Sequence, residues 1–190
     1  MNIILDIDGV IVRSRDIDTT IKHNVLRYLE FKFPDSDCKN LHRILFSNWG
    51  HTKLGLKVMC PHEDFEDFDA FVYTEETYES LKTYLADQDF SFLVQLIEHG
   101  NKIILFSNAP RRWAETVASS ISPLVEIHKP AWLKPDPRAY EGVPAGVFLD
   151  DSERNLVPVL HNKKWTPILF TKSLEFHLSE FANSIRSLHT

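Results

Sequence analysis

Four short, almost uninterrupted apolar runs constrain the fold of this chain more than any other feature of its sequence. Runs of this kind are typical of strands in a parallel sheet that helices cover on both faces. The four runs are Asn2–Asp8, Lys102–Ser107, Gly146–Leu149 and Thr166–Phe170, and a weaker fifth run is Leu124–His128. The sequence therefore predicts a parallel sheet as the centre of the fold.

Helical patterns alternate with these runs over most of the chain. They cover Phe92–His99, Pro110–Ser120, Ser152–His161 and Ser173–Leu188. Gly100 suits the end of the first pattern, and Pro110 suits the first turn of the second. The last two patterns each open with a serine, a residue that favours the N-cap position. Alternating strands and helices predict an α/β fold in which a doubly wound, Rossmann-like parallel sheet forms the core.

One long stretch, from about Ser14 to Asp89, contains no convincing strand. Its helix-like segments are Asp18–Phe31, Asp37–Phe46, His62–Tyr73 and Glu75–Leu85. The acidic run Glu63–Asp69 is expected to form a solvated helix face, with Phe65 and Phe68 turned inward. We therefore expect a helical insert after the first strand, with residues 1–13 and 90–190 forming the core and residues 14–89 forming the insert.

Composition narrows the class of protein. The 190 residues suit one domain, or one domain with an insert. The 21 Lys and Arg against 27 Asp and Glu give a net charge of -6 without a basic stripe, so we expect no nucleic-acid partner. No apolar run approaches the roughly 20 residues of a membrane span, so we expect no membrane partner either.

Two features favour a cytoplasmic location. The N-terminal stretch Met1–Val12 is apolar but contains Asp6 and Asp8, which a secretory signal would not carry. The two cysteines, Cys38 and Cys60, form no CxxC pair and suit a reducing compartment. The sequence does not decide the oligomeric state.

Polar and charged side chains follow three of the predicted strands. Because ligands bind at the carboxyl ends of parallel strands, these side chains are expected to meet at one edge of the sheet. They are Asp6 and Asp8 after the first run, Ser107 and Asn108 after the second, and Asp150 and Asp151 after the run at Gly146. A lysine, either Lys129 or Lys134, lies between the last two groups.

These residue types predict a metal and phosphate site. Asp6, Asp8 and Asp151 would form a cage of oxygens, which suits Mg²⁺. Buried carboxylates persist only beside a cation, which Lys134 and the metal would supply. Ser107 and the N–H groups after it open a helix, so they suit phosphate oxygens. The alternative is that the acidic residues only cap turns or helices, as Asp151 would in front of a helix.

Four segments in order resemble the four motifs of the haloacid dehalogenase superfamily. They are ILDIDGV (Ile4–Val10), LFSNAP (Leu105–Pro110), KPDPRAY (Lys134–Tyr140) and FLDDSERN (Phe148–Asn155). The resemblance covers the whole chain, with the insert in the position of the superfamily's cap domain. A less specific similarity, through SNWGHTKLGLKV (Ser47–Val58), is to pyrimidine 5'-nucleotidase-like members.

The resemblance implies a role for each site residue. Asp6 would be the nucleophile that forms an aspartyl-phosphate, and Asp8 the general acid and then the base. Ser107 and Asn108 would bind the transferred phosphoryl group, and Lys134 would pair with Asp6 and the phosphate. Asp151, Asp6 and the backbone carbonyl of Asp8 would hold Mg²⁺. Asp150 and Asn155 would not bind the substrate or the metal directly, but would position the residues that do.

One departure from the superfamily concerns the lysine. Typical members have a full helix between the motif lysine and the next strand, whereas only Ala139–Ala145 remains here. Either the core is trimmed at this edge, or Lys129 supplies the ammonium group. Lys134 has the better local match, and Lys129 has the more usual distance to Asp150.

The predicted function is a Mg²⁺-dependent phosphomonoesterase that acts on a small phosphorylated metabolite. By resemblance, a nucleoside monophosphate is the first expectation and a sugar phosphate the second. The alternatives are a non-catalytic binding protein of the same fold, a phosphomutase, and a haloacid dehalogenase. Asp8 disfavours the dehalogenase, because expelling a halide needs no proton.

Overall fold

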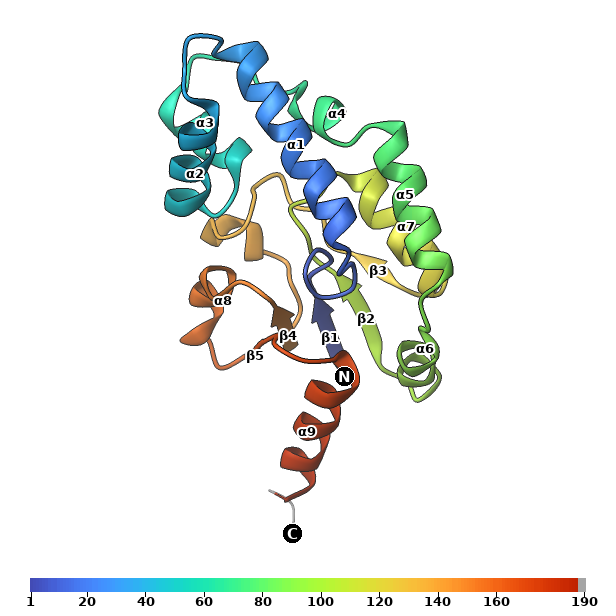
Figure 1. Cartoon of the computed structure of the whole chain (residues 1–190). Coiled ribbons are helices and arrows are strands. Elements are labelled where there is room, and N and C mark those ends of the chain that lie inside the picture. Colours follow the sequence, from blue (N-terminus) through green and yellow to red (C-terminus); the bar gives the residue numbers. More distant parts are fainter. Residues whose placement is uncertain (188–190) are drawn as a thin grey trace.

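Five strands form one parallel sheet, which confirms the predicted α/β fold. The computed structural model describes the backbone of residues 1–187 and the side chains of residues 1–180. All five apolar runs form strands: β1 (Asn2–Leu5), β2 (Lys102–Leu105), β3 (Glu126–Ile127), β4 (Gly146–Asp150) and β5 (Trp165–Leu169). The strand order is β3-β2-β1-β4-β5, so β1 is central and buried between β2 and β4 (Figure 1).

Helices cover both faces of this sheet. One face packs on α6 (Ser91–Glu98), α7 (Arg111–Ile121) and α9 (Leu174–Ser187) through a cluster that contains Ile3 and Leu5. The other face, which carries Ile4 and Phe148, packs on α8 (Glu153–Leu160) and a short 3-10 helix at Pro137–Tyr140. The helices predicted after Phe92, Pro110, Ser152 and Ser173 are thus confirmed. Leu188, the predicted end of the last helix, lies outside the described residues.

The predicted insert is helical and lies between β1 and β2 in the chain. Its helices are α1 (Arg15–Lys32), α2 (Cys38–Trp49), α3 (Thr52–Met59), α4 (Phe68–Val72) and α5 (Glu75–Ala86). Helices α1 to α4 lie beyond the arrowheads of the strands, over the carboxyl edge of the sheet (Figure 1). Tyr28, Leu45, Phe65 and Phe68 form a buried cluster within the insert, so both phenylalanines point inward as predicted. Helix α5 instead contributes Leu81 to the cluster on the sheet.

Two parts of the insert differ from the sequence-based expectation. The helix expected over His62–Tyr73 spans only Phe68–Val72. The acidic run Glu63–Asp69 was expected to form a helix face, but most of it precedes α4 as bends, turns and irregular backbone. Helix α3 was not predicted, since Gly55 in its middle lowers helix propensity. Gly55 is needed there because a Cβ would lie 2.8 Å from Cδ2 of Leu45, so α2 and α3 pack closely.

Polar contacts join the insert to the core, among them a hydrogen bond of 3.0 Å from the N–H of Arg13 to the hydroxyl of Tyr84 in α5. Arg154 of α8 donates to the carbonyl of Phe46 over 3.3 Å and to the carbonyl of Ser47, both at the end of α2. Arg112 of α7 forms a two-pronged ion pair with Glu75 of α5, one bond of which is 2.7 Å long. None of the described helices is long and apolar enough to cross a membrane.

Candidate functional site

A tight turn at the end of β1 presents Asp6 at the carboxyl edge of the sheet. The Asp6 N–H continues the ladder by donating to the carbonyl of Leu149 over 2.9 Å, and its Oδ1 accepts the N–H of Ile7 over 2.7 Å. Gly9 turns the chain back with a φ of +83°. A Cβ on Gly9 would lie 2.0 Å from Oδ2 of Asp151, so glycine is required for β1 and β4 to bring their acidic ends together.

Lys134 is the buried cation of the site. Its Nζ lies 3.1 Å from Oδ1 of Asp6 and 2.6 Å from Oδ2 of Asp150, and the residue is 1% exposed. Burial alone would lower the pKa of Lys134, but the carboxylates of Asp6 and Asp150 outweigh burial and raise it. The Lys134 ammonium is therefore held in its charged form between two strand ends.

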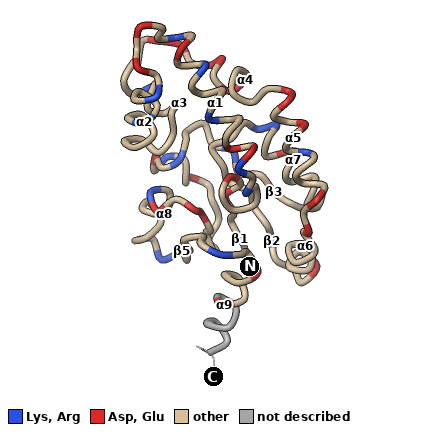
Figure 2. The backbone as a smooth tube through the Cα atoms, viewed as in Figure 1, with Lys and Arg blue, Asp and Glu red and all other residues tan. Residues whose placement is uncertain are grey.

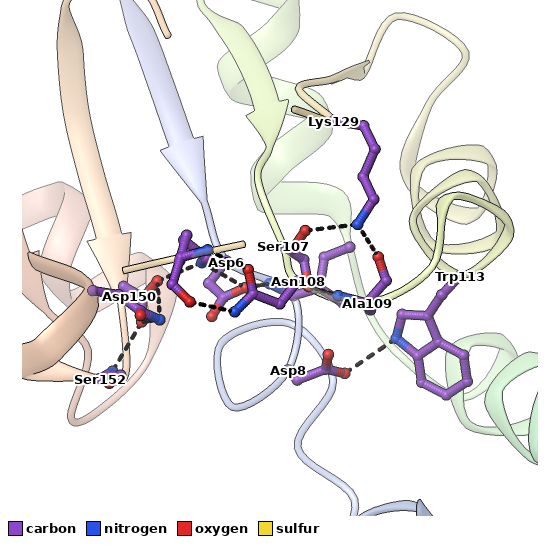
Figure 3. A network of polar contacts seen from close by, with 12 residues as sticks. Asp6, Asp8, Ser107, Asn108, Ala109, Trp113, Lys129, Asp150 and Ser152 are labelled. Atoms are coloured by element: carbon purple, nitrogen blue, oxygen red, sulfur yellow. Dashed lines mark hydrogen bonds and ion pairs between the residues drawn. The ribbon is translucent and has the colours of Figure 1, made fainter. Parts of the chain in front are cut away.

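Lys129, the alternative lysine, lies elsewhere. Its Nζ donates to the carbonyl of Ser107 over 3.2 Å and to the carbonyl of Ala109, both in the loop after β2 (Figure 3). Lys129 thus braces this loop, whereas Lys134 contacts the carboxylates.

The amide of Asn108 fixes the backbone of Lys134. Its Nδ2 donates to the Lys134 carbonyl over 2.9 Å, and its Oδ1 accepts the Lys134 N–H over 2.7 Å. The structure thus places this side chain, which was predicted to bind phosphate, on the backbone of the lysine. Ser107 is buried, and its Oγ accepts the N–H of Ala109 over 3.0 Å. Both residues line the cavity described below.

Asp150 is completely buried and its oxygens are already engaged by protein donors. Oδ1 accepts the N–H of Ser152 over 2.9 Å and Nδ2 of Asn155 over 2.9 Å. Oδ2 accepts the Lys134 ammonium over 2.6 Å. Asp150 therefore orients Lys134 and the start of α8.

Asp6, Asp150 and Asp151 bring three carboxylate oxygens within 4.8 Å of one another. Burial raises the pKa of both Asp6 and Asp151, and the charge of Asp150 adds to the rise in each case. The one ammonium group of Lys134 leaves this cluster with excess negative charge. Hard oxygen ligands that carry excess negative charge fit a small divalent cation such as Mg²⁺. The side chain of Asp8, which was predicted as a metal residue, is not part of this group of three.

Asp8 instead accepts a hydrogen bond from the indole of Trp113 in α7. The distance from Nε1 to Oδ1 of Asp8 is 3.1 Å, and Trp113 is completely buried (Figure 3). Burial raises the pKa of Asp8 to about 6, although the bond from Trp113 acts in the opposite direction. A carboxyl group with such a pKa can donate and accept a proton near neutral pH. The sequence did not identify Trp113, which reads as an ordinary apolar residue of a helix.

A cavity of about 690 Å³ lies between this edge of the sheet and the insert. Its core side is lined by Asp6, Asp8, Ser107, Asn108, Lys134 and Asp151. The insert contributes Asp18, Lys22, His42, Phe46, His51, Thr52, Phe68, Val72 and Tyr73. Within the part of the chain that the structure describes, Nδ1 of His51 is buried without a hydrogen-bond partner. The predicted site residues therefore share one cavity, and its far wall belongs to the insert.

No protein-family model matches this chain, and no curated protein matches its sequence.

Proposed function

We propose that this chain is a Mg²⁺-dependent phosphomonoesterase of the haloacid dehalogenase type, acting on a small phosphorylated metabolite. One observation carries the proposal: the buried ammonium of Lys134 lies between Asp6 and Asp150, beside Asp8, on the wall of a cavity of about 690 Å³. A charged lysine beside a carboxylate nucleophile suits the binding and transfer of an anionic phosphoryl group.

In the first half of the reaction, a carboxylate oxygen of Asp6 attacks phosphorus. Oδ1 already accepts the Ile7 N–H and contacts Lys134, which leaves Oδ2 for the attack. The bond between Asp6 and phosphorus forms as the bond from phosphorus to the leaving oxygen breaks. Asp8 gives its proton to that oxygen, and Lys134 and Ser107 stabilise the charge on the phosphoryl oxygens.

In the second half, water attacks the phosphorus of the aspartyl-phosphate. Asp8 takes a proton from this water, the bond between Asp6 and phosphorus breaks, and inorganic phosphate leaves. Asp8 is again protonated, which restores the starting state. The insert would shield the aspartyl-phosphate from other reactions by covering the cavity.

Asp6 and Asp151, with the backbone carbonyl of Asp8, would hold Mg²⁺. Asp150 is a poorer ligand, because Lys134, Ser152 and Asn155 already engage its oxygens. When bound, Mg²⁺ supplies positive charge that offsets the charge of the phosphate and of the carboxylates around it.

Phosphate release from a panel of phosphomonoesters, with Mg²⁺ and with EDTA, tests this proposal. Release that requires both Mg²⁺ and Asp6, the latter shown with Asp6→Asn, is the expected result. A folded protein that binds Mg²⁺ but moves phosphate within a substrate, without releasing it, would contradict hydrolysis and favour a phosphomutase. A folded protein with neither Mg²⁺ binding nor release would favour a non-catalytic binding protein.

A further inference from the structure

A second hollow adjoins the cavity on the surface of the insert. This basic groove has a volume of about 490 Å³ and lies between α1 and α2. Its lining consists of Lys22, Leu26, Lys39, His42, Arg43, Phe46 and Ser47. Lys22, His42 and Phe46 also line the main cavity, so the two hollows are neighbours that share part of their walls.

All the charged residues that line the basic groove are positively charged. Three of its lining residues are Lys or Arg and none is Asp or Glu, although the whole chain carries a net charge of -6. Figure 2 shows basic residues along α1 and α2. In the described part of the chain, Lys22, Lys39 and Arg43 form no ion pair with a carboxylate. The guanidinium of Arg43 donates only to a neutral partner, Oδ1 of Asn40, over 2.6 Å.

The main cavity and the basic groove therefore differ in what they can accommodate. The core wall of the cavity carries Asp6, Asp8 and Asp151, and in the proposed reaction Lys134 and Mg²⁺ offset their charge for one phosphoryl group. Asp18 and Lys22 of α1 add one charge of each sign to the same lining, so the cavity itself has no further excess of cations for a second anion. The neighbouring basic groove carries charge of the opposite sign. Phe46 lines both hollows and is 56% exposed, and its ring provides an apolar surface for a carbon skeleton.

We propose that the basic groove binds a second anionic group on the leaving group of the substrate. The preferred substrate is then a phosphomonoester that carries a second phosphate, one phosphate near Asp6 and the other near Lys39 and Arg43. This inference rests on the proposed phosphatase function and names the substrate class for the same site.

Matched pairs of esters test this inference. The probes are adenosine 3',5'-bisphosphate against adenosine 5'-monophosphate, and fructose 1,6-bisphosphate against fructose 6-phosphate. The measured quantity is the ratio of kcat/KM for the bisphosphate to kcat/KM for the monophosphate. We expect a ratio well above one in at least one pair, and a fall of about tenfold in the double variant Lys39→Gln/Arg43→Gln, since two exposed ion contacts are lost. Because the groove is exposed, added salt is expected to lower the ratio as well.

The matched control is Arg27→Gln/Lys163→Gln, which also removes one arginine and one lysine, here from exposed positions outside both hollows. The control is expected to keep the wild-type ratio. A ratio near one in both pairs, or an equal fall in the groove variant and the control, would overturn the inference while the phosphatase function stands.

Calorimetry with the same bisphosphates separates the two proposals if no ester is hydrolysed. Absence of hydrolysis counts against the proposed function alone. Binding of a bisphosphate that weakens at least fivefold in the groove variant, and not in the control, would still support the basic groove as an anion site. Equal binding by the wild type and the groove variant, or no binding by the wild type, would overturn it.

Discussion

The indole N–H of Trp113 lies 3.1 Å from Oδ1 of Asp8 and holds this carboxyl group beside the cavity. Trp113 is itself fixed by residues of the insert, since its ring forms T-shaped contacts with the rings of Tyr73 and Tyr78, at 5.2 Å and 5.7 Å between ring centres. The position of α5 on the core is thereby coupled to the orientation of the proposed general acid.

The first prediction removes this hydrogen bond while keeping an aromatic ring. Trp113→Phe leaves Asp8 free to rotate and removes the donor that favours its charged form. We expect kcat to fall about tenfold for alkyl phosphates, which need a proton on the leaving oxygen, and much less for p-nitrophenyl phosphate. The comparison of kcat for the two ester types, with Mg²⁺ saturating, measures the effect.

A purely structural role for Trp113 would give a different result. Loss of packing alone would lower the midpoint of thermal unfolding and reduce the activity on both ester types equally. Trp113→Phe in which the two ester types lose activity in the same proportion would therefore contradict the positioning role.

The second prediction concerns Asp8 directly. Asp8→Asn keeps the shape of the side chain but cannot supply a proton from a carboxyl group. We expect a loss of about 10²- to 10⁴-fold in kcat for alkyl phosphates, with a smaller loss for esters that have good leaving groups. A plot of log kcat against the pKa of the leaving alcohol should become steeper in the variant. An equal loss for all esters would contradict the general-acid role.

The strands and their ends could be predicted from sequence because they depend on local patterns. Runs such as Ile3–Leu5 are apolar on both faces, and the carboxyl ends of parallel strands must lie at one edge of the sheet. That logic predicts Asp6, Ser107 and Asp151 at one edge of the sheet, and in the structure all three line one cavity. The helix at Thr52–Met59 was missed because Gly55 lowers local propensity, whereas its value lies in the contact with α2.

The choice between the two lysines depended on contacts that sequence spacing does not encode. Lys134 reaches the carboxylates because Asn108, 26 positions earlier, holds its backbone through two hydrogen bonds. Trp113 was missed for the same reason. By pattern Trp113 is an ordinary helix residue, and it contacts Asp8 only because α7 packs beside the end of β1. The sequence indicates only that His51 belongs to the insert and could face a substrate, whereas the structure places it in the cavity wall.

The third prediction tests the buried charge cluster. Lys134→Met leaves Asp6 and Asp150 buried without their ammonium partner. We expect the free energy of unfolding at pH 8, measured with urea and EDTA, to fall by about 3–5 kcal/mol. The loss should be smaller at pH 5, because protonation of Asp6, whose pKa is already raised by burial, removes one of the repelling charges. Lys129→Met is the control, since Lys129 contacts backbone carbonyls, and an equal or larger loss there would contradict this account.

The last prediction uses His51 in the wall of the cavity, whose Nδ1 is buried with no hydrogen-bond partner among the described residues. Burial lowers the pKa of His51 to about 4; Lys53 and Lys129 act in the same direction, and Asp69 opposes them. The unfolded chain takes up a proton near pH 6.5 that the folded chain accepts only near pH 4, so acidification favours the unfolded state. Between pH 7 and pH 5, His51 should therefore cost about 2 kcal/mol of stability. Urea unfolding of the wild type and of His51→Gln at both pH values measures this difference, because the other titrating groups are common to both proteins. A wild type and variant that lose the same stability between pH 7 and pH 5 would show that His51 is not held neutral in the cavity.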